Sequence, residues 1–260
     1  MQLIALPAFN DNYIWLLQQA GRALVVDPGD AAPVQAALQS LQLECIFITH
    51  QHHDHIDGLP ELATQFQPII YAPEHPAIAH KAATQVPAAQ LNALGLPWQV
   101  LHAPGHTLNH LLYYCASVAL DTGAVPLLFC GDTLFSAGCG RLFEGTPAQM
   151  LHSLGLINRL PAECLVCCTH EYTLTNLRFA LSLEPENADL QQYQAHCMNL
   201  RERGLPTLPS TLQTERRINP FLRVFEPDFA AAMAVHFGLD HQTDALAVFT
   251  ALRLARNQFA

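Results

Sequence analysis

One short stretch, ITHQHHDHIDG from Ile48 to Gly58, constrains the fold more than any other part of the chain. It places four histidines and two aspartates within the eight positions from His50 to Asp57. The stretch follows ECIFIT, an apolar run typical of a strand that is buried on both faces. Such a group of side chains would make a poor surface turn and a worse core. We therefore expect a metal site at the end of a rigid, buried strand.

The spacing inside this stretch allows two arrangements. In an extended chain, His50, His52 and Asp54 would point to one side and His55 to the other, because side chains alternate along a strand. A bend would instead direct His50 and His52 to one ion, and Asp54 and His55 to a neighbouring ion. With the bend, His53 is the odd member, and we take it as a non-ligand.

Three later residues can complete such a site, because each follows a strand-like run. His106 follows WQVLH at a Pro-Gly turn, Asp132 follows LLFCG, and His170 follows LVCCT. Sheets with parallel strands place their sites at strand ends in this way. Imidazole and carboxylate groups bind Zn²⁺ and also accept iron or manganese. A carboxylate can bridge two ions with its two oxygens, so Asp132 is the candidate bridge. Two ions about 3.5–4 Å apart can also share a water and lower its pKa to about 7.

Two further histidines, His102 and His110, flank the turn that carries His106. They are candidates for partners that orient the metal ligands rather than for ligands themselves.

The pattern of short strands ends near residue 170, which divides the chain into a mixed α/β domain, 1–170, and a helical domain, 171–260. In the first domain, Thr146, Pro147 and Gln149 predict the capped start of a helix. In the second, GLPTLPSTLQTERRINPF, residues 204–221, is rich in Pro, Thr and Ser and indicates a long connection between helices.

Composition excludes several classes of protein. A net charge of −10 argues against nucleic-acid binding. The N-terminal segment MQLIALPAFNDNY has no basic region typical of a secretory signal, and no run reaches the ~18 apolar residues that span a bilayer. Most of the eight cysteines lie in apolar runs, which indicates buried reduced thiols in a cytoplasmic protein. The Cys164-x-x-Cys167 spacing alone is weak support for a metal or redox site. We expect a monomer with no membrane partner.

The stretch from Thr49 to His55 matches T-H-x-H-x-D-H, the signature of the metallo-β-lactamase superfamily. Three later segments resemble glyoxalase II, the hydroxyacylglutathione hydrolases: GDTLFSAGCGRLFEGT at 131–146, THEYTLTNLRFA at 169–180 and NPFLRV at 219–224. The resemblance covers the chain essentially end to end. It implies an α/β fold, a four-layer αββα sandwich with the site at one edge between the sheets, followed by a C-terminal helical domain.

The resemblance also implies a ligand set and a reaction. Two divalent ions, zinc in the first place with iron or manganese as alternatives, would hydrolyse a thioester such as S-D-lactoylglutathione to glutathione and D-lactate. This reaction is the second step of methylglyoxal detoxification. A bridging hydroxide would attack the carbonyl, and Asp54 and Asp132 would be the catalytic residues. The implied ligands are His50, His52 and His106 for one ion, Asp54, His55 and His170 for the other, and Asp132 as the bridge.

The substrate-binding residues implied by the resemblance are Arg141, Phe143, Tyr172, Arg253 and Arg256. Arg253 and Arg256 lie three apart on a predicted helix, so they share a face and can bind a carboxylate together. The alternative is that both are solvated surface arginines. Many members of the family have tyrosine where Phe143 stands, so only the backbone of Phe143 could donate a hydrogen bond there.

Other functions stay open at this point. A mononuclear-iron glutathione persulfide dioxygenase shares the fold, although the intact set of Asp54, His55 and His170 favours two metals. A non-catalytic, metal-stabilised binding module would have closed sites with no exchangeable water. Hydrolysis of β-lactams is disfavoured because the expected signal peptide is missing, and nucleic-acid processing is disfavoured by the charge.

Overall fold

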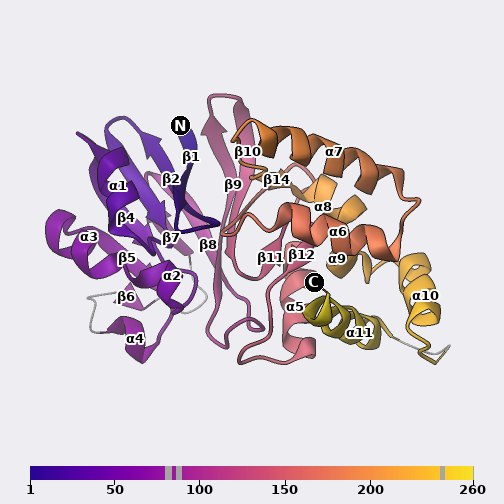
Figure 1. Cartoon of the computed structure of the whole chain (residues 1–260). Helices are drawn as coiled ribbons and strands as arrows, with labels where there is room; N and C mark the ends of the chain where they lie inside the picture. The colour runs from indigo at the N-terminus through magenta and orange to yellow at the C-terminus, as the bar shows by residue number, and fades with distance from the viewer. Residues whose placement is uncertain (80–83, 86–89, 241–243, 260) are drawn as a thin grey trace.

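The computed structural model describes residues 1–79, 84–85, 90–240 and 244–259, and it has two mixed sheets packed face to face with helices outside both (Figure 1). The predicted α/β class, the four-layer sandwich and the helical C-terminal region are confirmed. Strand β2 (Asn12–Gln19) shows why the layers form, since its side chains alternate between two cores. Trp15 and Leu17 pack between the sheets, whereas Ile14 and Leu16 pack under the outer helices.

The first sheet carries the signature stretch. Its strands, in spatial order, are β1 (Gln2–Ala8), β2 (Asn12–Gln19), β3 (Arg22–Val26), β4 (Gln42–Phe47), β5 (Ile69–Ala72) and β6 (Thr84–Gln85). The first three strands pair antiparallel, and β3 to β6 pair parallel. The helices of this half are α1 (Ala31–Leu38), α2 (His53–Ile56), α3 (Leu59–Phe66) and α4 (Pro76–Ala79). Helix α4 has only four residues, and residues 80–83 lie outside the described residues.

The second sheet carries the three later strand ends. Its strands, in spatial order, are β14 (Ser210–Thr211), β13 (Leu165–Cys168), β10 (Gly123–Gly131), β9 (Leu111–Leu120), β8 (Leu96–His102) and β7 (Gln90–Ala93). A small hairpin, β11 (Leu134–Phe135) and β12 (Gly138–Cys139), follows β10 and was not predicted.

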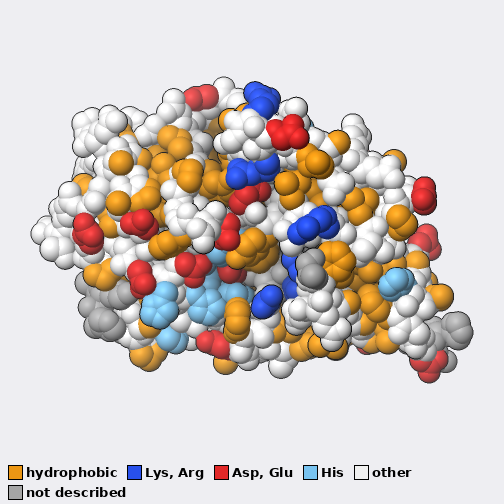
Figure 2. Space-filling view, in the orientation of Figure 1, with side chains coloured by type: hydrophobic (Ala, Val, Ile, Leu, Met, Phe, Trp, Pro, Cys, Tyr) orange, Lys and Arg blue, Asp and Glu red, His pale blue; other side chains and the backbone are white. Residues whose placement is uncertain are grey.

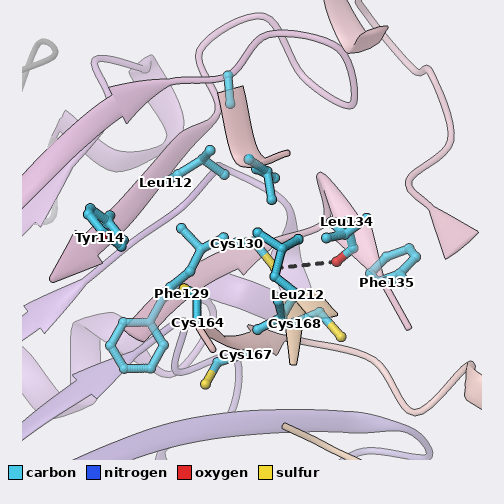
Figure 3. Close-up of a cluster of buried hydrophobic side chains, with 14 of the residues drawn as sticks. Leu112, Tyr114, Phe129, Cys130, Leu134, Phe135, Cys164, Cys167, Cys168 and Leu212 are labelled. Carbon is cyan, nitrogen blue, oxygen red and sulfur yellow. Dashed lines mark hydrogen bonds between the residues drawn. The ribbon is translucent and has the colours of Figure 1, made fainter. Parts of the chain in front are cut away.

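All eight cysteines are free and buried, as the sequence indicated. Cys164 and Cys167 lie with Phe129 and Leu212 in the apolar cluster drawn in Figure 3, where the Cys130 thiol donates to the Leu134 carbonyl at 3.3 Å. The Cys164-x-x-Cys167 spacing therefore belongs to core packing.

Helices dominate the chain after β13. One helix, α5 (Pro147–Ile157), precedes β13. The helices after β13 are α6 (Thr173–Leu183), α7 (Ala188–Glu202), α8 (Leu212–Ile218), α9 (Pro220–Arg223), α10 (Pro227–His236) and α11 (Ala245–Gln258). The capping box predicted at Thr146 and Gln149 is present. Within the described residues, none of these helices is long and apolar enough to cross a membrane.

The prediction of a long connection at 204–221 is wrong, because this segment holds β14, α8 and the first half of α9. Two of its polar residues, Thr211 and Asn219, are helix N-caps. The Thr211 side chain accepts a hydrogen bond from the Thr214 N–H at the start of α8, and the Asn219 side chain accepts one from the Phe221 N–H at the start of α9. Residues that favour loops and residues that favour N-caps are the same, so composition alone could not separate them.

The topology brings four strand ends to one place. Strands β10 and β13 are parallel, and β8 runs in the same direction as both because β9 lies antiparallel between β8 and β10. Their carboxyl ends therefore meet at one edge of the second sheet. The end of β4 joins them, since the Leu111 N–H of β9 donates to the Thr49 carbonyl at 2.9 Å.

Candidate metal centre

The signature stretch bends where α2 begins at His53, so the bent arrangement is the one that the structure adopts. His50 and His52 lie in the extended segment before the helix, with His50 Nε2 3.0 Å from His52 Nδ1. Asp54 and His55 lie in the helix. The His53 side chain is exposed and faces Asp57 at 3.1 Å, an outward position that suits a non-ligand.

The first group of potential ligands contains His50, His52 and His106. His106 comes from the turn after β8, and its Nε2 atom lies 3.0 Å from His52 Nδ1. One nitrogen from each of the three rings lies within 4.8 Å of the other two. Three imidazoles at this separation can hold one cation.

The second group contains Asp54, His55 and His170. The Asp54 Oδ2 atom lies 3.6 Å from His55 Nε2 and 3.4 Å from His170 Nε2. His170 arrives from the end of β13, and the three ligand atoms again lie within 4.8 Å of one another. This group offers a carboxylate and two imidazoles, so it can hold a second cation.

Asp132 lies between the two groups and turns one oxygen to each. Its Oδ1 atom lies 3.5 Å from His55 Nε2 and 3.4 Å from His170 Nε2, whereas its Oδ2 atom lies 3.4 Å from His106 Nε2. Asp132 Oδ1 and His55 Nε2 are both buried, and neither has a hydrogen-bond partner within the described part of the chain. Buried polar atoms are rarely left unpaired, so these two orphaned atoms fit a bound cation. All seven predicted ligands thus converge on one centre.

The ring nitrogens that face away from the centre are held by residues that sequence reasoning missed. His55 Nδ1 donates to Asp27 at 3.0 Å, and His170 Nδ1 donates to Asp11 at 2.8 Å. Asp27 follows β3 in the turn VVDPGD, with a left-handed φ of +52° that is uncommon for aspartate. The position of Asp27 in a turn after a strand could have indicated a role at the site. Aspartate is also common in Asp-Pro-Gly turns for local reasons, so its presence there did not single it out.

His110 supports Asp132 as the sequence suggested, and His102 does not. The buried His110 ring accepts a hydrogen bond from the Asp132 N–H at 3.2 Å. His102 instead bonds the Leu108 carbonyl and is exposed. Gly131 explains how Asp132 is placed: its φ is +47°, and a Cβ atom there would lie 2.4 Å from Thr49 Oγ1. Only glycine therefore fits directly before Asp132.

The electrostatics of the centre favour positive charge between the carboxylates. Burial lowers the pKa of the His50 imidazole well below its ordinary value, and the neighbouring imidazoles lower it further. Burial also lowers the pKa of His170, but the negative charge of the Asp132 carboxylate and the hydrogen bond to Asp11 outweigh this and raise that pKa to about 9. For Asp132, burial raises the pKa, and the nearby His170 and His55 together lower it far below the ordinary value. A cation would therefore take the place of the proton that His170 attracts, whereas the neutral His50 imidazole is already in the form that binds a metal.

A cavity of about 610 Å³ opens beside the centre, and His106 and Asp132 form part of its wall. Histidine side chains gather in one patch on this face, with acidic side chains beside them and arginine side chains nearby (Figure 2). All five residues implied as substrate contacts line the same cavity: Arg141, Phe143, Tyr172, Arg253 and Arg256.

The two arginines of α11 are not solvated surface residues. Arg253 is only 5% exposed, and its guanidinium donates to the Cys139 carbonyl at 2.7 Å and lies 5.1 Å from the centre of the Phe221 ring. Its Nε atom is buried with no hydrogen-bond partner in the described chain. Arg256 is half-buried, and burial together with the charge of Arg253 lowers its pKa. Neither guanidinium group forms an ion pair with a residue that the structure describes, so both bring positive charge to the wall of the cavity.

Phe143 and Tyr172 contact the metal centre as well as the cavity. The Phe143 N–H already donates to the His106 carbonyl at 3.2 Å, so the backbone donor expected at this position is engaged within the protein. The Phe143 side chain is 64% exposed and sets its ring edge-on to His52 and His106. The ring of Tyr172 lies against His170.

Comparison with known proteins agrees with this geometry. Residues 8–170 match the family model of the metallo-β-lactamase superfamily, and residues 171–259 match the model described as hydroxyacylglutathione hydrolase C-terminus. The chain is 49% identical to a hydroxyacylglutathione hydrolase of Albidiferax ferrireducens and 47% identical to one of Pseudomonas aeruginosa, each over the whole of both chains. A relative of the same name from Vibrio parahaemolyticus is 46% identical, also over the whole of both chains.

Solved structures resemble the chain in fold. ETHE1 from Myxococcus xanthus superposes with a TM-score of 0.63 at 23% identity, over 98% of this chain and all of that one. The BLEG-1 B3 metallo-β-lactamase superposes with a TM-score of 0.60 at 21% identity, over 85% of this chain and 98% of that one. At such low identity these likenesses bear on the fold alone.

Proposed function

Because the chain belongs to the hydroxyacylglutathione hydrolase family of the metallo-β-lactamase superfamily, we propose that it hydrolyses S-D-lactoylglutathione and related glutathione thioesters. The products would be glutathione and D-lactate, as in the second step of methylglyoxal detoxification. The observation that carries this proposal is the position of Asp132. It faces both groups of potential ligands and also forms part of the wall of the arginine-lined cavity.

We propose that the centre holds two divalent ions, zinc in the first place. The orphaned atoms of His55 and Asp132 support this, as do the two ligand groups. When bound, the two ions would polarise a carbonyl and lower the pKa of a shared water. Imidazole and carboxylate donors also suit iron and manganese. The proposed ligands are His50, His52 and His106 on one side, Asp54, His55 and His170 on the other, and Asp132 between them.

The protein's own residues would position the thioester. Glutathione carries two carboxylates, and a protein of net charge −10 needs a local cluster of positive charge to bind them. Arg141, Arg253 and Arg256 line one cavity and supply that cluster, and each can bind a carboxylate with two parallel hydrogen bonds. With the peptide held there, the acyl group would reach the wall formed by His106 and Asp132.

Asp54 and Asp132 are the carboxylates proposed to be catalytic. Asp54 Oδ2 and Asp132 Oδ1 each lie 3.4 Å from His170 Nε2, so two carboxylate oxygens converge on one point. Both oxygens would hold the ions, which when bound lower the pKa of water, so that hydroxide can add to the thioester carbon after the proton has gone to solvent. The carbon–sulfur bond then breaks, and the thiolate leaves toward the cavity side.

We further propose that residues 1–170 form the catalytic domain and residues 171–260 the substrate-binding domain. The ranges of the two family matches support this division. The cavity supports it too, since Arg141 comes from the first part and Arg253 and Arg256 from the second. The eight free cysteines support a cytoplasmic location. The expectation of a monomer stays a prediction.

A glutathione persulfide dioxygenase is the alternative that shares the fold. Full-length identities of 45–49% to hydroxyacylglutathione hydrolases favour the hydrolase, whereas the likeness to ETHE1 extends only to the fold. Purified protein given S-D-lactoylglutathione should consume the thioester and release free thiol without taking up oxygen. Oxygen uptake with glutathione persulfide, together with no thioester hydrolysis, would overturn the proposal.

A further inference from the structure

The turn after β1 and the first residue of β2 supply two consecutive polar residues, Asp11 and Asn12, to the second group of potential ligands. Asp11 accepts the hydrogen bond from His170 Nδ1 at 2.8 Å, and the Asn12 amide donates to Asp54 Oδ2 at 2.9 Å. Each therefore holds a different member of the same group. Neither residue stands out in the sequence, because their contacts arise only when this turn reaches the end of β13.

Backbone pairing fixes this turn against the strand end that carries His170. The Tyr13 N–H donates to the Thr169 carbonyl at 2.6 Å, and the Glu171 N–H donates to the Asp11 carbonyl at 2.8 Å. Asn12 and His170 form an isolated antiparallel bridge between these two bonds. The Asp11 carboxylate is thus held at a set position relative to the His170 ring.

Asp27 adds a third contact on the same side. It accepts hydrogen bonds from His55 Nδ1 at 3.0 Å and from the Thr49 N–H at 2.7 Å, and it is buried. Both imidazoles of the Asp54, His55 and His170 group therefore donate directly to a carboxylate.

The other group is oriented by neutral oxygens. His106 Nδ1 donates to the Arg141 carbonyl at 2.8 Å. His50 Nδ1 bonds the Thr49 hydroxyl at 3.1 Å, and that hydroxyl in turn donates to Asp27 at 2.6 Å. The carboxylate thus reaches His50 only through a hydroxyl group.

This difference has a physical consequence for cation binding. A carboxylate behind a ligating imidazole fixes its tautomer, orients its ring and makes it a stronger base, and loss of such a partner typically weakens metal binding by about 10–100-fold. The second group also contains a ligand with negative charge, Asp54, whereas the first contains three imidazoles. Both effects strengthen cation binding by the Asp54, His55 and His170 group relative to the other group.

We propose that Asp11 and Asn12 form a clamp that makes the site at Asp54, His55 and His170 the tighter of the two cation sites. This site fills first and empties last. Asp11 and Asn12 are positioning residues, since they act through His170 and Asp54. The proposal rests on the proposed metal centre, but it does not depend on which thioester is the substrate.

Cobalt(II) is a suitable probe, because its absorption spectrum reports on each site as it fills. Metal-free wild-type protein is titrated with Co²⁺, and loaded protein is dialysed against graded concentrations of a chelator, with Co²⁺ per chain measured by elemental analysis. The wild type should lose its two ions in separate steps. Asp11→Asn should lower the Co²⁺ affinity of the tighter site by about 10–100-fold, so that both ions leave the protein at similar chelator concentrations. Asn12→Ala should lower the affinity of the same site.

Two measurements separate this from a general loss of structure. The metal-free forms of Asp11→Asn and wild type should unfold at nearly the same temperature, because the substitution preserves shape and backbone pairing and the ion pair that it removes is partly exposed to solvent. Asp57→Asn is the matched control, since Asp57 belongs to the same histidine-rich stretch but contacts the exposed His53. It should retain both steps unchanged.

Retention of the tighter ion by both Asp11→Asn and Asn12→Ala would overturn the clamp. Anomalous scattering that showed the His50, His52 and His106 site to be the weakened one would also overturn it. Either result would leave thioester hydrolysis by the wild type intact, so failure of the clamp is distinguishable from failure of the proposed function. A wild type that bound no Co²⁺ would overturn the metal centre and the clamp together.

Discussion

The ring of Tyr172 lies parallel to the ring of His170, with centroids 4.7 Å apart and an interplanar angle of 2°. His170 belongs to the candidate metal centre, and Tyr172 lines the arginine-containing cavity. The two residues are separated by a single position in the sequence, yet they face different parts of the site. This stack therefore joins the place where a thioester would bind to the place where it would react.

The hydroxyl and the ring of Tyr172 should have separable effects. Tyr172→Phe keeps the stack and removes the hydroxyl that is proposed to hydrogen-bond the substrate in the cavity. Such a bond is worth about 0.5–1.5 kcal/mol, so KM for lactoylglutathione should rise by up to about 10-fold with kcat nearly unchanged. Tyr172→Ala also removes the stack and should lower kcat as well. Steady-state kinetics distinguishes the two. Wild-type kinetics in both variants would exclude Tyr172 from the site.

Asp132 should be essential for metal retention and for catalysis. Because its two oxygens face different ligand groups, Asp132→Ala should lose at least one metal ion and at least about 10²-fold in kcat. The fold should be largely kept, as measured by circular dichroism. His53→Ala, an exposed change in the same histidine-rich stretch, serves as the control. Full metal occupancy with normal turnover in Asp132→Ala would contradict the bridging role.

The two arginines of α11 should differ in what they affect. Arg256→Ala removes a half-buried charge and should raise KM by about 10–100-fold, the loss expected for a charge-assisted hydrogen bond, with little change in stability. Arg253→Ala also leaves the buried Cys139 carbonyl without its donor and should cost a further ~1–3 kcal/mol of stability. Kinetics and thermal unfolding of both variants test this. Unaltered activity in the double variant would remove Arg253 and Arg256 from substrate binding.

Glu215 should make stability depend on pH. This buried carboxylate of α8 accepts hydrogen bonds from Ser136 and from the Ala137 N–H, next to the hairpin that follows Asp132. Burial raises its pKa above the ordinary value of 4.5, so the folded state holds a proton that the unfolded state releases. The protonated carboxyl of Glu215 therefore makes its full contribution to the free energy of unfolding below pH 4.5, and this contribution is lost as the pH rises through the raised pKa.

Glu215→Gln should flatten this dependence, because it stays neutral while its amide can still bond Ser136 and Ala137. Glu215→Ala should destabilise the protein by about 1–3 kcal/mol at every pH, since it leaves the Ala137 N–H unpaired. Melting temperature measured from pH 4.5 upward tests both expectations. A Glu215→Gln profile that parallels the wild type would show that another group carries the pH dependence.

The convergence of the seven candidate ligands could be predicted from the sequence because each of them follows a buried strand. Apolar runs before His106, Asp132 and His170 predicted strands, and strand ends gather at one edge of a sheet. The spacing inside the signature stretch left two arrangements open, since only the start of α2 at His53 decides between them. Four residues are too few for a helical period to show in the sequence.

The residues that orient the ligands could not be predicted in the same way. Asp11 lies 159 positions before His170, and their contact depends on how the turn between β1 and β2 packs against β13. Asp27 has a local explanation in its Asp-Pro-Gly turn, which hides its bond to His55. The prediction for the segment 204–221 was wrong for a related reason. Its cap residues can be recognised as caps only once Leu212 and Glu215 are known to be buried in a helix.

Elemental analysis of purified protein, run beside thioester hydrolysis, tests the central claim most directly. Two ions per chain together with hydrolysis of S-D-lactoylglutathione are expected, because two ligand groups share Asp132. Removal of both ions by a chelator should abolish hydrolysis and lower the melting temperature, and zinc should restore both. Full hydrolysis by the metal-free protein would contradict the account, and so would a single tightly bound iron with oxygen uptake in place of hydrolysis.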